Sequence, residues 1–253
     1  IKTLKYRPRW EAFKTISKRL LKNKAAVVGG IIIIFFVIVA LLGPLLVKTD
    51  PNHHDFLNKL QPPSKEHWFG TDNFGRDIFS RIVHGAKLTL IVGFLSVAVG
   101  GIIGVLVGII SGYYGGWVDT ISMRIVDVLL AFPGILLALA IVSVLGGSIQ
   151  NVILAVGIFS IPAFARIVRG STLQVKKLEY IDAVRSLGAS DMRIIFRHIL
   201  PNIMSPIIVQ ATMRIATAIL TAAGLSFLSL GAPPPTPEWG AILNEGRIYM
   251  NNA

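Results

Sequence analysis

The histidines of residues 48–87 are the first side chains whose chemistry needs an explanation. His53, His54 and His67 lie in this stretch near Asp50 and Asp55, and imidazole and carboxylate groups can together bind a metal ion. Their spacing does not match the HExxH pattern, in which two histidines share one face of a helix. We therefore interpret them as residues of a solvated loop, and no metal site is predicted.

Groups for covalent catalysis do not form a recognisable pattern either. Ser160, Ser226 and Ser229 have no base nearby in the sequence that could activate a hydroxyl nucleophile. The chain has no cysteine, so thiolate nucleophiles and thiolate metal sites are excluded. We predict no catalytic residue, and an intramembrane hydrolase is a disfavoured alternative.

Nucleotide chemistry requires a phosphate-binding loop, and the sequence contains none. The G-x-x-x-x-G-K-[ST] pattern does not occur, and the glycine-rich stretch 112–116 lacks the lysine that would reach the phosphates. We interpret this stretch as a plain turn. No cofactor is predicted for this chain, and if ATP drives it, a separate chain hydrolyses the ATP.

Long apolar runs are the elements that must position any functional residue of this chain. Of its 253 residues, 53% are hydrophobic and 15% are charged, against about a quarter charged in soluble domains. A run of about 20 apolar residues is long enough to cross the membrane as a helix. The runs that qualify are 25–47, 88–111, 128–147, 152–165 with its flanks, and 203–230. They predict an all-α membrane protein with five spans.

Lysine and arginine near the ends of these runs predict the orientation of the chain. Residues 1–24 carry nine basic residues against one acid, and 166–197 carry seven against three, whereas 48–87 is nearly balanced. We expect 1–24 and 166–197 to lie in the cytoplasm and 48–87 outside. The net charge of +12 is then a topology signal and a contact with the lipid surface, and nucleic acid is not expected as a partner.

Arg214 is the one charge well inside a predicted span, about one third of the way along 203–230 from its cytoplasmic end. One interpretation is an arginine that snorkels or bonds a carbonyl within a protein interior, and the other is a pore-lining contact for a peptide carboxylate. We prefer the first, because the sequence does not show which way the side chain faces. Such a scarcity of charges disfavours an ion-coupled carrier or channel.

Glycines indicate where another helix can approach the second run. Gly100, Gly104, Gly108 and Gly112 recur every four residues, which places them along one face of a helix. Without side chains they allow a neighbouring helix to pack closely, so we predict a helix-packing role. Pro133, in the third run, is expected to bend its helix.

A short amphipathic pattern lies in the basic loop, with apolar residues at every third position between charged ones. These apolar residues are Leu178, Ile181, Val184 and Leu187. Gly188 is expected to end this helix, Ser190 to cap a second helix, and Leu200-Pro201 to end that helix or bend it into the fifth span. The pattern suits a helix lying on lipid headgroups, and equally a docking helix that takes force from a soluble partner.

The same loop resembles the EAA motif of ABC-importer permeases, which reads E-A-A, three residues, G, nine residues and I-x-L-P. Asp182-Ala183-Val184 stands for E-A-A, Gly188 is in register, and His198-Ile199-Leu200-Pro201 ends the motif. Asp for Glu, Val for the second Ala and His for Ile are departures, although the spacing holds. The resemblance implies coupling helices at 178–200. The residues it implicates in coupling to an ATPase are Asp182, Ala183, Val184, Gly188, Leu200 and Pro201.

Three further stretches resemble the C-type permease of the dipeptide, oligopeptide and nickel importer family. They are 69–81, which reads FGTDNFGRDIFSR, Leu130-Ala131-Phe132-Pro133, and 225–240, which begins LSFLSLG. Ser229 stands where that family usually has glycine. The resemblance covers about residues 5–250 and implies the type I ABC-importer fold, with 88–253 as the permease core. That family has six spans, so we expect a sixth span beyond the end of this sequence.

The resemblance also implies partners and a function. A related second permease, two ABC ATPase subunits carrying ATP and Mg²⁺, and an extracytoplasmic solute-binding protein would complete the assembly. This chain would be its non-catalytic pore subunit, importing di- or oligopeptides across a bacterial or archaeal cytoplasmic membrane. An importer of nickel or of a metal chelate from the same family is the main alternative, and an ion-coupled carrier is a less favoured one.

Overall fold

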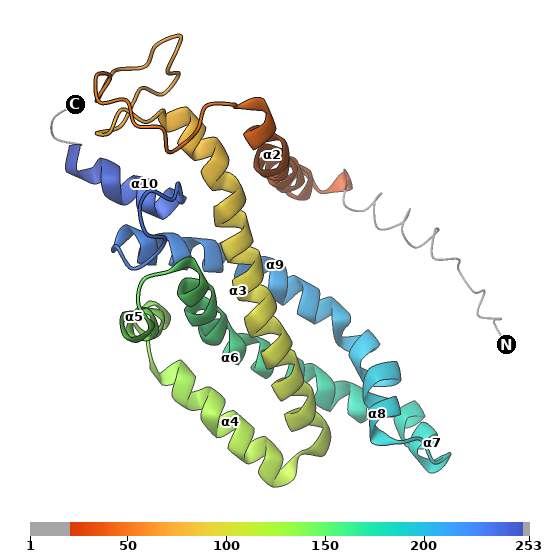
Figure 1. Ribbon diagram of the computed structural model, residues 1–253. Helices are drawn as coiled ribbons and strands as arrows, with labels where there is room; N and C mark the ends of the chain where they lie inside the picture. Colours follow the sequence, from red (N-terminus) through yellow and green to blue (C-terminus); the bar gives the residue numbers. More distant parts are fainter. Residues whose placement is uncertain (1–20, 250–253) are drawn as a thin grey trace.

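The computed structural model describes residues 21–249, and the chain there is built mostly from helices (Figure 1). Four helical runs are long and apolar enough to cross a membrane. They are α2 (Lys24–Leu46), α3 (Ile78–Tyr114), α6 (Ile149–Lys176) and the run Asp191–Phe227, which contains α9 (Leu200–Phe227). A bent pair of helices brings the number to five if it counts as one span. The all-α class is confirmed. Four of the five predicted spans correspond to these helical runs, and the third corresponds to the bent pair only if that pair counts as one span.

The bent pair consists of α4 (Gly116–Ala131) and α5 (Gly134–Leu145), whose axes meet at 90°. The third apolar run was expected to be one bent helix over 128–147, and this expectation is wrong. Pro133 lacks a backbone N–H, and the residue before it, Phe132, is extended with ψ 135°, so the helix ends there instead of bending. The expected plain turn at 112–116 is also shorter than predicted, because α3 continues to Tyr114 and α4 starts at Gly116.

α3 runs the length of the molecule and packs along α6 (Figure 1). Gly100, Gly104, Gly108 and Gly112 all face α6. A Cβ atom added at Gly104 would lie 2.6 Å from the Cβ of Phe164 and 2.7 Å from the carbonyl oxygen of Ile161. The backbones of α3 and α6 therefore approach more closely than two helices with side chains at these positions could.

α2 packs on the rest of the chain near its C-terminal end. Asn23 caps its start, since the side-chain oxygen accepts hydrogen bonds from Ala25 N at 3.1 Å and Ala26 N at 3.3 Å. Its buried residues are Ala40 and Gly43, and Gly43 lies against Val83 of α3. Residues 21–249 thus leave most of the surface of α2 uncovered. Residues 1–20, which make up most of the basic segment 1–24, lie outside the described residues.

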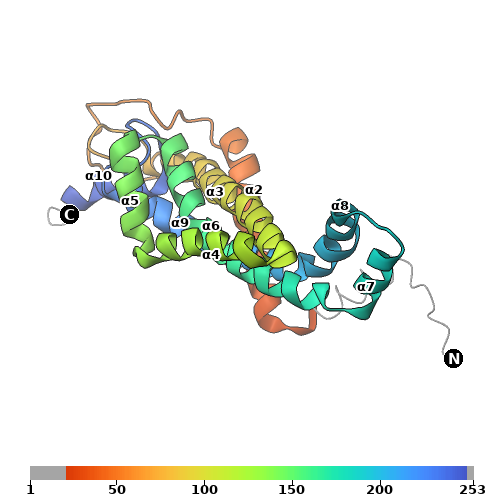
Figure 2. The same cartoon turned by 90° about the horizontal axis from the view of Figure 1, so that it is seen from below.

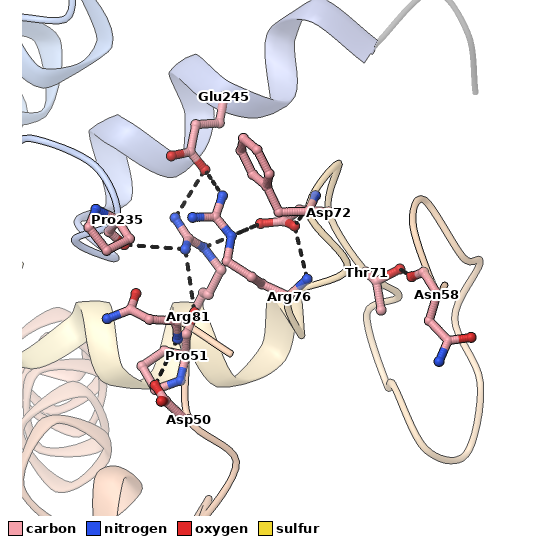
Figure 3. A network of polar contacts seen from close by, with 11 residues as sticks. Asp50, Pro51, Asn58, Thr71, Asp72, Arg76, Arg81, Pro235 and Glu245 are labelled. Carbon is pink, nitrogen blue, oxygen red and sulfur yellow. Dashed lines mark hydrogen bonds and ion pairs between the residues drawn. The ribbon is translucent and has the colours of Figure 1, made fainter. Parts of the chain in front are cut away.

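The loop between α2 and α3 lies at the same end of the molecule as α10 (Trp239–Gly246), which is followed by a 3₁₀ turn at Arg247–Tyr249 (Figure 1). Figure 3 shows the side chains that join them. Arg76 and Arg81 are each only 1% exposed, and both donate to the same Glu245 oxygen, at 2.6 Å and 3.0 Å. Arg76 also donates to Asp72, at 2.6 Å. The network binds the loop, the start of α3 and α10 into one block.

Candidate functional site

α7 (Glu179–Ser186) follows α6 after a short turn and is the predicted amphipathic helix. Glu179 and Asp182 lie in its first turn, where the helix dipole favours negative charge. Its predicted apolar face is divided, because Ile181 is fully buried whereas Leu187, just after the helix, is 87% exposed. α7 is therefore anchored on one side and presents an apolar side chain on the other.

Gly188 ends this helix, as predicted, in a left-handed conformation with φ +81°. Its N–H donates to Arg185 O at 2.9 Å, and the N–H of Ala189 donates to Val184 O at 3.3 Å. Both bonds satisfy carbonyls at the helix end that have no partner within the helix. A Cβ atom on Gly188 would meet nothing within 4 Å, so the need for glycine here comes from the backbone and not from crowding.

The second helix of the segment differs from its prediction in one respect. Ser190 precedes α8 (Asp191–Ile194) as expected, but its side chain makes no capping hydrogen bond. Leu200-Pro201 was expected to end this helix or bend it into the fifth span. The helix does not end there, because the chain stays helical from α8 through a π-helical stretch, η1 (Ile195–Ile199), into α9. In η1 the N–H of Leu200 donates to Ile195 O, five residues back. The wider π turn accommodates the proline, so no break is needed.

A cluster of isoleucines lies beneath α7 and η1 and joins them to the long helices. Its buried members are Ile109, Tyr113, Val168, Ile181, Ile194, Ile195, Ile199 and Ile203. They come from α3, α6, α7, α8, η1 and α9. The cluster therefore packs α7 against the three long helices α3, α6 and α9.

Tyr113, at the end of α3, adds polar contacts to this cluster. Its hydroxyl donates to Asp191 Oδ1 at 2.6 Å, and its carbonyl accepts a hydrogen bond from Lys176 at the end of α6. The guanidinium of Arg185 lies over its ring, 5.9 Å from the ring centre. Sequence reasoning missed this residue, because its partners lie more than 60 positions away and no local pattern connects them.

The predicted coupling residues occupy two neighbouring parts of this end. Asp182, Ala183 and Gly188 are exposed around the tip of α7, and Val184 is half-buried against the cluster. Leu200 packs against the cluster and Pro201 is exposed at the start of α9. The amide of Asn202 connects the two parts by donating to Tyr180 Oη at 3.0 Å and to His198 O at 2.6 Å.

The tip of α7 projects beyond the helical bundle, at the end away from α10 (Figure 2). Besides Leu187, two large apolar side chains nearby are exposed, Met192 at 61% and Phe196 at 52%. The ion pair of Asp182 with Arg185, at 3.3 Å, is exposed and contributes little to stability. This tip therefore presents large apolar side chains that residues 21–249 leave uncovered.

Arg214 lies near the middle of α9, where its guanidinium carbon is 5.6 Å from the centre of the Phe159 ring on α6. This is further along the helix than predicted, because α9 begins at Leu200 and ends at Phe227. Two other charged pairs connect α4 to α6, namely Arg169 with Asp119 at 2.5 Å and Arg166 with Asp127 at 2.6 Å. The sequence analysis did not foresee these pairs.

The histidines of the loop between α2 and α3 do not gather around a common point. His67 Nδ1 lies 3.0 Å from Asp77 Oδ1, while His54 stacks on Phe74 with ring centres 5.4 Å apart. Within residues 21–249, no three histidine, aspartate or glutamate side chains are placed to hold a metal ion. This end of the molecule is therefore organised by the arginine–carboxylate network.

An exposed apolar tip, a buried apolar cluster and long apolar helices are thus joined in one chain, and this chain was compared with known families. Residues 104–250 match the family described as binding-protein-dependent transport system inner membrane component. The chain belongs to this family. Residues 12–63 also match the N-terminal transmembrane domain of oligopeptide transport permease C. The predicted resemblance to C-type permeases is confirmed, and the chain is a permease subunit of an ABC importer, a multi-pass protein of the cytoplasmic membrane.

Curated relatives of this permease cover most of its length. A glutathione transport system permease protein of Pectobacterium atrosepticum is 51% identical over 92% of this chain and 78% of its own. A dipeptide transport system permease protein of Alkalihalophilus pseudofirmus is 51% identical over 96% of this chain and 79% of its own. An inward-facing methionine ABC transporter matches in fold, with a TM-score of 0.57 and 23% identity over 68% of this chain and 82% of its own. The type I ABC-importer fold is therefore confirmed.

Proposed function

We propose that this permease imports di- or oligopeptides, and that α7 and the turn at Gly188 are where a separate ATPase subunit pushes on it. The observation that carries the coupling proposal is that the apolar residues of this segment face two ways. Ile181 is fully buried, whereas Leu187, just after α7, is 87% exposed. The relatives named for glutathione and for dipeptides support a peptide substrate, since glutathione is itself a small peptide.

Force applied at this tip has a defined route into the membrane. Ile181 of α7 packs in the same cluster as Ile109 of α3, Val168 of α6 and Ile203 of α9. Movement of α7 would shift these spans together and change which side of the membrane the pore opens to. The permease performs no covalent chemistry in this cycle.

The proposal places the rest of the machinery on other chains. Two ABC ATPase subunits would bind ATP and Mg²⁺, a related second permease would complete the pore, and an extracytoplasmic binding protein would deliver the peptide. The N-terminus and 178–200 would then face the cytoplasm, and the loop between α2 and α3 would face the binding protein together with α10. The excess of lysine and arginine in 1–24 and 166–197 supports this orientation.

Reconstitution of the complex in proteoliposomes tests this function. Uptake of a labelled short peptide should require ATP and the loaded binding protein, and Gly188→Arg should abolish uptake while ATP hydrolysis becomes independent of the binding protein. The variant must still co-purify with its partners, which shows that it folds. Normal uptake by Gly188→Arg would defeat the coupling role.

Competition distinguishes the substrate from the main alternative. Excess unlabelled peptide should suppress uptake of the labelled peptide, whereas excess nickel should not. Suppression by nickel alone would favour a metal importer. Uptake that persists without ATP but collapses with an ion gradient would instead indicate an ion-coupled carrier.

A further inference from the structure

We infer that Arg214 is a substrate contact on the translocation path, binding a carboxylate of the transported molecule near the middle of the membrane. The inference rests on the proposed importer function and deepens it. It concerns the membrane centre, away from the ATPase-coupling tip, and it selects one of the two interpretations that the sequence left open for this residue.

The position of Arg214 argues against snorkelling. It lies 14 residues after Leu200 and 13 before Phe227, which at a rise of about 1.5 Å per residue is about 20 Å from either end of α9. An arginine side chain cannot reach the headgroups from there. An arginine at the centre of a lipid-facing helix costs about 3 kcal/mol even on the most lenient scales. Arg214 therefore faces protein or water.

The guanidinium has no counter-ion within residues 21–249. Its side chain makes no ion pair or hydrogen bond there, and its one specific contact is the face of Phe159. The carboxylates of α4 are already taken, Asp119 by Arg169 and Asp127 by Arg166. The positive charge is held in place by an aromatic ring but is not neutralised, which leaves its donors available.

The surroundings of Arg214 form a polar stripe on a helix that this chain leaves largely uncovered. Gln210, Arg214, Thr217 and Thr221 follow one another at intervals of four, three and four residues, so they lie along one face of α9. In the apolar window of this run only 11% of residues are buried, against 50% for α6. A polar stripe on an uncovered helix at this depth is typical of a water-filled path, where intramembrane charges are functional.

The chemistry of the ligand follows from the charge and shape of the guanidinium. Its planar donors match the two oxygens of a carboxylate, as at the C-terminus of a peptide. The same charge repels a bare divalent cation. A carboxylate-bearing substrate is thus attracted to the centre of the path, while a free metal ion is not.

Paired substrates test this inference. Uptake is measured in proteoliposomes with a peptide and its C-terminal amide, chosen so that the binding protein binds both and supplied at saturating levels. The wild type should move the free acid faster. Arg214→Gln should slow the free acid by about tenfold or more, because a hydrogen-bonded charge contributes about 1.5–3 kcal/mol, and should leave the amide nearly unchanged. Arg214→Lys should restore part of the preference.

Other outcomes of this experiment overturn the inference. An equal fall for acid and amide would mean that Arg214 supports the gate, for example by pairing with the second permease. A wild type without preference, or an unaffected Arg214→Gln, would show that the carboxylate is not bound there. Wild-type complex that fails to take up either peptide with ATP would contradict the proposed function instead.

Photo-crosslinking provides a second readout that does not depend on rates. A photoreactive residue at Thr217, on the polar stripe, should label with a transported peptide during ATP-driven turnover, and excess unlabelled peptide should suppress the labelling. The matched control is Ile102 on α3, an exposed apolar position at 64%, which should not label. Labelling at Ile102 but not at Thr217 would contradict a path along this stripe.

Discussion

At the scale of single residues, the proposed coupling role depends most directly on the backbone conformation of Gly188. Its φ is +81°, in the left-handed region, and the space around it is open. A larger side chain would therefore fit, but any L-residue is strained in this backbone conformation. A non-glycine residue in this conformation costs about 1–2 kcal/mol, and asparagine tolerates it best. The turn that orients Leu187 thus depends on one residue type.

We predict that Gly188→Val impairs coupling more than Gly188→Asn, because a β-branched residue is least compatible with this φ. Both should fold and assemble, since the strain is confined to an exposed turn. ATPase activity stimulated by loaded binding protein measures the effect. Gly170→Ala on α6 is the control, because a Cβ there also meets nothing within 4 Å and the residue lies inside a helix. Equal stimulation for Val and Asn would contradict the role of this backbone conformation.

Single residues also show what the sequence could and could not predict. Gly188 was recognisable as a helix end from local pattern alone, because its conformational role acts within a few residues. Tyr113 was not, since its contacts with Lys176 and Asp191 exist only after α3 and α6 pack together. Glu245 was missed for the same reason, as it meets Arg76 across 169 positions.

At the scale of elements, the contact between α3 and α6 determines how rigid the permease core is. The predicted glycine face gave the position of a close contact, and the structure identifies α6 as the partner. At Gly104, a Cβ would lie 2.7 Å from a backbone oxygen of α6, and backbone cannot move aside as a side chain can.

Gly104→Ala should therefore lower thermal stability in detergent, by about 1–3 kcal/mol for overpacking of this kind. Alanine itself favours helix, so any loss comes from the contact with α6. Gly30→Ala on α2 is the matched control, since its Cβ meets nothing within 4 Å, and it should be neutral or slightly stabilising. Equal melting temperatures for the two variants would show that α3 and α6 are less closely packed than described.

The break between α4 and α5 shows where pattern reasoning fails for elements. Apolar composition alone cannot separate a bent helix from two helices at 90°, because both have the same composition. Pro133 and the extended Phe132 decide in favour of two helices. At Leu200-Pro201 the sequence left two alternatives, an end or a bend, and the structure excludes the end, because the helical run continues through η1 into α9.

At the scale of the whole molecule, the arginine–carboxylate network and the isoleucine cluster hold opposite ends of α3. Arg76 and Arg81 are buried and share Glu245, so removing that charge leaves two guanidiniums with one close carboxylate, Asp72. Breaking a buried pair on one side is strongly destabilising, since the remaining charge is left without compensation.

Glu245→Gln is expected to destabilise the permease by about 3 kcal/mol and to loosen α10 from the start of α3. Hydrogen exchange of α10 and thermal unfolding of the intact complex measure the two effects. The neighbouring Asn244→Ala removes an exposed hydrogen bond to Ser229 and should change little. If Glu245→Gln unfolds like the wild type, the network does not hold this end together.

The central claim is that α7 is the surface on which a separate ATPase acts. The most direct test introduces a cysteine at Leu187, which is then the sole thiol of this chain, because the sequence has no native cysteine. A thiol-reactive photo-crosslinker at this position should capture an ATPase subunit of the intact complex, with a yield that changes with nucleotide. A cysteine at Leu57, which is 95% exposed in the loop between α2 and α3, should capture none. Products from Leu187→Cys that contain lipid but never an ATPase subunit, in a complex shown to be intact, would contradict the account.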